Sequence, residues 1–162
     1  MKKYPLEQLA FIKKKKLQES ERILREKKEE LAAAEEKLRQ VELERDKAKA
    51  HKIEKLKQLR DALDEGKPTS KIEQMRTYMK IVEEKLQSHE KKVAAQKEEV
   101  VKAEEAVEAA RQDMLKRQRD VEKLKEHKGE WTKEMHKELE KEEAKEEDET
   151  GTTRFIRKKK GH

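Results

Sequence analysis

Cysteine is absent from this chain of 162 residues, and proline, glycine and aromatic residues are scarce. Without cysteine the chain forms no disulfide, no thiolate zinc site and no cysteine nucleophile, and this usage fits a reducing compartment. No apolar run approaches the roughly 18 residues that span a bilayer. Residues 1–16 also lack the apolar core and cleavage site of a signal peptide. The sequence therefore predicts a cytoplasmic protein that does not span a membrane.

Charged residues are abundant instead: they make up 51% of the chain, against 31% apolar residues. This composition is typical of long helices and coiled coils when an apolar period is present, and of disorder when it is absent. The net charge of +6 is a small difference between 44 basic and 38 acidic residues, which are mostly interspersed. Interspersed charge indicates a solvated helix surface, whereas a nucleic-acid footprint requires clustering.

The apolar residues follow a heptad repeat. From Ile72 one column recurs every seven residues, and a second begins three residues later at Met75, together extending over nine heptads. This far exceeds the three or four heptads that indicate a coiled coil. A similar pair of columns starts at Leu17 and Ser20. Around residues 45–52 that pattern slips, and it resumes at Ile53, Leu56, Leu59 and Leu63, which predicts a local unwinding.

Gly66 and Pro68 mark the one interruption of the helical pattern. Glycine suits the left-handed position that ends a helix, and Pro68 blocks continuation, while Ser70 and Glu73 predict a capping box for the next helix. If the chain folds back here, facing residues have numbers that sum to about 134. Opposite charges then meet in pairs such as Lys28–Glu104, Glu35–Lys97, Lys49–Glu83, Lys16–Asp120 and Glu44–Lys92. A slip of one heptad brings like charges together, so flanking charges favour this register.

We therefore predict an all-α fold in which two long helices form an antiparallel coiled-coil hairpin. The chain is expected to be one domain, 1–162, and a monomer. The first helix covers about 5–64, the turn about 65–70 and the second helix about 71–147. A mobile C-terminal tail is expected over about 148–162, because glycine and threonine interrupt the pattern there.

Three sequence features resemble functional sites, but a structural interpretation fits each of them better. "EGKPTSK" resembles the end of a phosphate loop, but Asp61 stands where that motif needs glycine. The basic run Lys13–Lys16 before heptad leucines resembles a basic leucine zipper, yet that alignment puts Glu21, Lys28, Glu35 and Glu42 at core positions. The five histidines are expected to be solvated, with His89 facing Arg45 as a polar layer; they are His51, His89, His127, His136 and His162. We predict no catalytic site, metal, cofactor or small-molecule substrate, and no enzyme.

Two apolar clusters exceed what a bare coiled coil needs. One lies near the amino terminus and comprises Tyr4, Leu6, Leu9, Phe11 and Ile12. The other follows the turn and comprises Met75, Tyr78, Met79 and Val82. Because exposed apolar clusters mark interaction sites, the two clusters predict two protein partners.

"YPLEQL" at the start and "ERDKAKAHKIEKLKQLRDALDEGKPTSKIEQMRTYMKIV" through the turn, followed by a long charged helix, resemble the YscO/SctO family. These are the FliJ-like stalk proteins of type III secretion systems. The resemblance implies a hairpin similar to the gamma-subunit stalk of rotary ATPases. It also implies that the amino-terminal cluster engages the hexameric export ATPase, that the tip reaches the export gate, and that secretion chaperones are escorted. "GKPTS" differs from the "GTTS"-like turn of the family.

Two alternative functions remain at the level of sequence. One is a nucleic-acid-binding helical protein that uses Lys13–Lys16 and the basic tail, with binding that falls steeply with salt. The other is a homodimeric structural coiled coil, whose stability depends on concentration.

Overall fold

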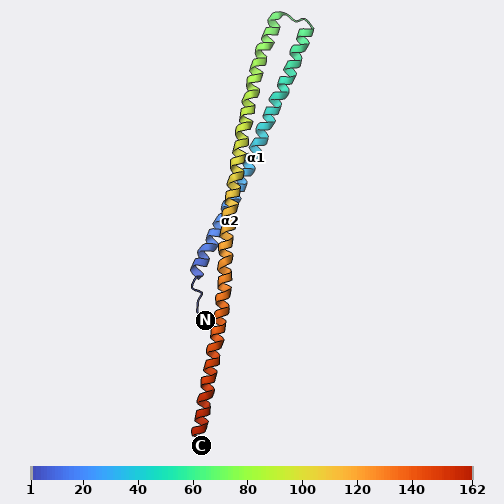
Figure 1. Cartoon of the computed structure of the whole chain (residues 1–162). Coiled ribbons are helices and arrows are strands. Elements are labelled where there is room, and N and C mark those ends of the chain that lie inside the picture. Colours follow the sequence, from blue (N-terminus) through green and yellow to red (C-terminus); the bar gives the residue numbers. More distant parts are fainter. Residues whose placement is uncertain (1, 162) are drawn as a thin grey trace. The chain divides into compact units, whose positions relative to one another are not determined.

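The computed structural model describes residues 2–161, and it contains two α-helices and no strand within that range (Figure 1). Helix α1 spans Glu7–Asp64 and helix α2 spans Thr69–Lys160. The all-α fold with two long helices packed against each other is confirmed. Within residues 2–161, neither helix combines the length and the apolar character that a membrane span requires.

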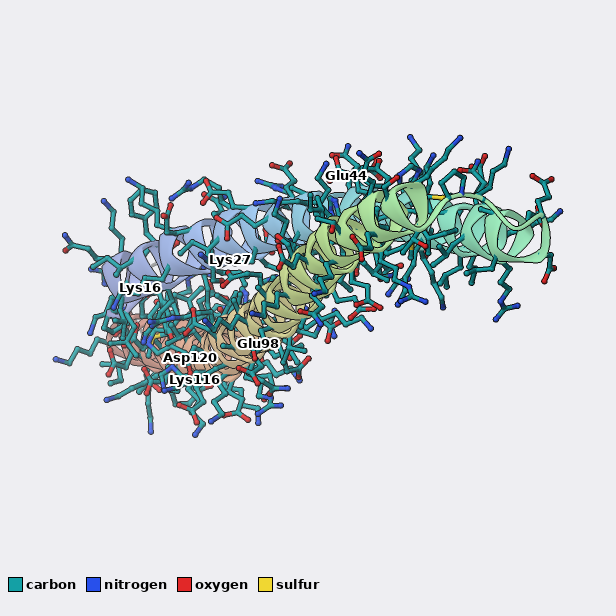
Figure 2. All side chains as sticks on the ribbon, turned by 90° about the horizontal axis from the view of Figure 1, so that it is seen from above. Lys16, Lys27, Glu44, Glu98, Lys116 and Asp120 are labelled. Carbon is teal, nitrogen blue, oxygen red and sulfur yellow. The ribbon has the colours of Figure 1, made fainter. Side chains whose placement is uncertain are left out.

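The chain divides into two compact units. The hairpin unit is Arg22–Gln112, and the terminal unit joins the residues up to Glu21 with those from Asp113 onward. Both helices contribute to each unit, and their side chains stand out on all sides, with nitrogen and oxygen tips interspersed (Figure 2).

The seam of the hairpin unit lies between antiparallel stretches of α1 and α2. All the apolar residues that α2 buries in this unit belong to the two predicted heptad columns. They are Ile72, Met79, Val82, Leu86, Val93, Val100, Val107 and Ala110. The predicted seam of α2 is therefore confirmed.

The predicted slip in α1 is wrong. Of the four residues on which that prediction rests, Ile53 and Leu63 are exposed, whereas Leu56 and Leu59 are half-buried. The half-buried and buried positions continue at strict heptad spacing through Arg45, Lys52 and Leu59, and likewise through Ala48, Lys55 and Ala62. Arginine and lysine lay their alkyl stems along apolar surface while the charged heads reach water, so polar residues continue the seam without an insertion.

The register agrees with the prediction, although the ion-pair partners differ. Gln96 donates a hydrogen bond to the carbonyl oxygen of Ala34, with 3.0 Å between the heavy atoms. Lys52 lies 3.4 Å from Glu83, which sequence reasoning had paired with Lys49. His89 lies 4.0 Å from Glu44, for which Lys92 had been expected. The residue numbers in these pairs sum to between 130 and 135, close to the predicted 134. In both ionic pairs the partner lies one helical turn from the residue expected. The polar layer of His89 with Arg45 stays a prediction.

A Schellman motif ends α1. Gly66 has a φ of 69°, its N–H donates to the carbonyl of Leu63, and the N–H of Lys67 donates to that of Ala62. The predicted left-handed glycine is thus confirmed. The predicted capping box is wrong, because the carbonyl of Pro68 accepts the first bonds of α2, from Lys71 and Ile72. Ser70 consequently lies inside the helix and not at its cap.

In the terminal unit, α2 extends farther than predicted. Lys13 pairs with Asp120 at 3.5 Å, one turn from the expected Lys16, and Glu7 pairs with Lys128 at 2.9 Å. The helix continues to Lys160 and does not end near residue 147. Thr152 and Thr153 cause no break, since their hydroxyl groups donate to carbonyls four residues earlier in the helix. The mobility of residues 148–161 stays a prediction, and His162 lies outside the described residues.

Candidate partner-binding surfaces

Tyr4 fastens the amino-terminal segment to α2. The side chain is buried, its hydroxyl is hydrogen-bonded to Nδ1 of His127, and its ring meets that of Trp131 edge-on at 5.4 Å between centroids. The ammonium of Lys128 lies 5.9 Å from the ring centre. Tyr4 was predicted to meet a partner, but the structure places it in the interior, where it holds the start of the chain.

Three of the five predicted amino-terminal residues are exposed. Leu9, Phe11 and Ile12 are exposed to 40%, 58% and 42%, whereas Leu6 is half-buried. Leu9 and Ile12 are three residues apart and therefore share a face of α1. Phe11 lies on another side of the helix, with the Lys15 ammonium 4.7 Å from its ring centre. The apolar surface available to a partner is Leu9, Phe11 and Ile12.

Only one of the four predicted tip residues is exposed. Met79 and Val82 are buried in the seam and Met75 is half-buried, while Tyr78 is exposed to 42%. Ile81, exposed to 45%, adds to this surface, and sequence reasoning missed it. The available signal was spacing: Ile81 lies three residues after Tyr78 and outside both seam columns, so both occupy a second face of α2.

Tyr78 stands between two hollows of the hairpin unit. The first, of about 300 Å³, is lined by Glu44, Lys47, Ala48 and His51 from α1 and by Tyr78, Ile81, Val82, Lys85 and His89 from α2. The second, of about 240 Å³, is lined by Lys55, Gln58, Lys71, Gln74, Met75, Tyr78 and Met79. We call the two hollows together the Tyr78 groove.

Contacts from α1 hold the tyrosine ring in place. The Tyr78 hydroxyl is hydrogen-bonded to Nε2 of His51 at 3.1 Å, and the two rings lie nearly perpendicular, 6.2 Å apart. The ammonium of Lys55 lies 5.6 Å from the Tyr78 ring centre. An amphipathic ring with a fixed position is a common anchor in protein interfaces.

The described residues show no site for metal chemistry. Within residues 2–161, no three histidine, aspartate or glutamate side chains come close enough together to hold a metal ion. No buried side-chain nitrogen or oxygen there lacks a hydrogen-bond partner. Exposed apolar side chains on charged helices are therefore the features of this structure that point to partners.

Comparison with known proteins identifies the family. The YscO-like protein family matches residues 1–161. The solved structure of a candidate YscO homolog, CT670, from Chlamydia trachomatis is similar to this chain with a TM-score of 0.93. The two sequences are 40% identical, and the similarity covers 100% of each chain. A search of the curated proteins gave no match. The match along residues 1–161 and the similarity at 40% identity show that the chain belongs to the YscO-like family and is associated with type III secretion.

Proposed function

We propose that this protein is a non-catalytic, cytoplasmic stalk or adaptor of a type III secretion system. It couples the hexameric export ATPase to the export gate and escorts secretion chaperones. Membership of the YscO-like family supports the secretion context. The two exposed apolar surfaces, one in each unit, support a protein with more than one partner.

The ATPase assignment rests on the exposed surface of Leu9, Phe11 and Ile12. These large apolar side chains lie among the lysines that begin α1, and nothing in the chain covers them in the described residues. Aromatic side chains bury the most area in a protein interface and often dominate its binding energy, which makes Phe11 the expected anchor. Tyr4, although buried, contributes by fixing the segment that precedes this surface.

The gate or a chaperone is the proposed partner of the hairpin tip. Tyr78 offers the exposed contact there, and Met75, Met79 and Val82 support it from the seam. In both units the helices are joined by heptad packing, which positions these side chains on a regular helical scaffold.

Stimulation of the cognate export ATPase tests the proposal. Leu9→Asp and Phe11→Asp each place a charge on the proposed contact, and each is expected to raise the half-maximal concentration for stimulation at least about tenfold. Both side chains are exposed, so circular dichroism should show unchanged helicity. Ile53→Asp is the matched control, because it places the same charge on another exposed apolar residue of α1, in the hairpin unit. Undiminished stimulation by Leu9→Asp and Phe11→Asp would remove the ATPase assignment.

A further inference from the structure

The residues that line the Tyr78 groove recur at alternating spacings of three and four. On α1 they include Glu44, Ala48, His51, Lys55 and Gln58, and on α2 Lys71, Gln74, Tyr78, Ile81 and Lys85. This spacing defines one stripe on each helix, and both stripes line the same groove. The stripe of α2 lies outside the seam, whereas that of α1 includes the seam positions Ala48 and Lys55. Each stripe covers about four helical turns, or about 21 Å. Two adjacent stripes of this kind present the geometry that a third helix needs to join a two-stranded coiled coil.

The charge of the groove is locally unbalanced. Its lining includes four lysines, Lys47, Lys55, Lys71 and Lys85, but a single carboxylate, Glu44, which itself lies beside His89. Among the described residues, Lys47, Lys71 and Lys85 form no ion pair. Another hollow of the hairpin unit, lined by four alanines and Gln96, also contains two lysines and two glutamates. The positive excess of the Tyr78 groove is thus absent from that hollow.

The apolar floor of the groove supplies the contact area. Tyr78 and Ile81 are partly exposed above the buried side chains of Val82 and Met79. The bond from His51 and the cation over the ring hold Tyr78 in one position before a partner arrives. A side chain that is already ordered loses little conformational entropy on binding, which favours its use as an anchor.

From this geometry we propose that the Tyr78 groove binds an acidic amphipathic helix of a partner protein as a third helix. Apolar side chains of that helix pack on Tyr78 and Ile81, and its carboxylates face Lys47, Lys55, Lys71 and Lys85. The inference rests on the proposed function in one respect: it specifies the chemistry of the partner surface that meets the hairpin tip. A helix of about 14 residues matches the length of the stripes.

Binding of designed peptides to the full-length chain tests this inference. The probe is a labelled helical peptide of about 15 residues, with leucine at heptad spacing and glutamate elsewhere. Fluorescence anisotropy should show that it binds and that added salt weakens binding, because opposite charges meet at a solvent-accessible rim. A counterpart with lysine in place of glutamate should not bind.

Variants of the groove locate the site. Tyr78→Ala and the double variant Lys47→Glu/Lys85→Glu should each weaken binding of the acidic peptide about tenfold or more. The double variant Lys37→Glu/Lys102→Glu is the matched control: it makes the same charge change at the alanine-containing hollow of the same unit and should leave binding unchanged. Equal binding by all these variants, or by the basic peptide, would overturn the proposal.

Two further arms separate this inference from other outcomes. The segment 138–149 of this chain is itself acidic and exposed. A peptide of that segment that displaced the designed probe at equal concentration would identify a second copy as the occupant and overturn the assignment to a partner protein. Leu9→Asp should keep peptide binding while it loses ATPase stimulation. If the peptide does not bind, but Leu9→Asp still abolishes ATPase stimulation, the groove inference is rejected and the proposed function stands.

Discussion

One backbone position ends the first helix of this chain. Gly66 is the only described residue with a positive φ, and its N–H and that of Lys67 bond two carbonyls in the last turn of α1. A Cβ built at Gly66 would meet no atom within 4 Å. The requirement for glycine therefore comes from the left-handed backbone conformation alone and not from a lack of space.

Gly66→Ala should destabilise the protein by about 1 kcal/mol, since a side chain disfavours the left-handed conformation. Gly129→Ala is the matched control, because Gly129 lies within α2 and its added Cβ also meets nothing within 4 Å. Alanine is the better helix former by up to ~1 kcal/mol, so this variant should be stabilised. Urea denaturation of both variants measures the sign of each change in the free energy of unfolding. Stabilisation by Gly66→Ala would show that the turn does not require the left-handed conformation.

At the scale of the element, polar residues complete the seam of α1. Arg45, Lys52 and Lys55 occupy heptad positions between the apolar layers, and the exposed apolar residue Ile53 lies beside them. The continuity of the seam thus depends on alkyl stems and not on the residue class at each position. In this arrangement the charged ends of the side chains reach the surface and can form ion pairs there, as Lys52 does with Glu83.

Two apolar-to-lysine substitutions in α1 distinguish the continuous seam from a slipped one. Ile53→Lys should change the free energy of unfolding by less than about 0.5 kcal/mol, because the side chain is 62% exposed. Leu59→Lys should cost about 2 kcal/mol or more, because Leu59 lies on the seam. Thermal unfolding monitored by circular dichroism gives both values. A large cost for Ile53→Lys would instead support the slip that the sequence pattern predicts.

The packing of the helices was predictable from the sequence where apolar residues form the seam. The seam of α2 follows from its valines, leucines and methionines, and the turn follows from Gly66. The seam of α1 was misread where stems of lysine and arginine carry it, because hydrophobic periodicity does not register them. Long charged side chains also reach a partner one turn away, which displaced the predicted ion pairs. The burial of Tyr4 depends on its contact with Trp131, which is far away in the sequence, and no local sequence pattern predicts that contact.

At the scale of the whole molecule, each unit satisfies its apolar seam within the same chain. In the hairpin unit α1 buries the heptad columns of α2, and in the terminal unit Tyr4, Ser20 and Val121 are each buried. Most of the remaining surface is charged, with 44 basic and 38 acidic residues interspersed in the chain (Figure 2). A second copy therefore finds no uncovered seam to pair with, and the surface pairs that could form are each worth only about 0–1 kcal/mol.

We accordingly expect a monomer whose thermal midpoint is independent of protein concentration. An obligate homodimer would gain about 1.4 kcal/mol of apparent stability for each tenfold rise in concentration, and its midpoint would rise by several degrees. Sedimentation velocity and thermal scans over a hundredfold range check this expectation. Leu139→Asp provides the control, because Leu139 is an exposed apolar residue of α2 beyond Trp131. If the midpoint rises with concentration and this substitution abolishes the rise, the far part of α2 mediates self-association. A rise that survives the substitution would instead show that the seam is shared between two chains.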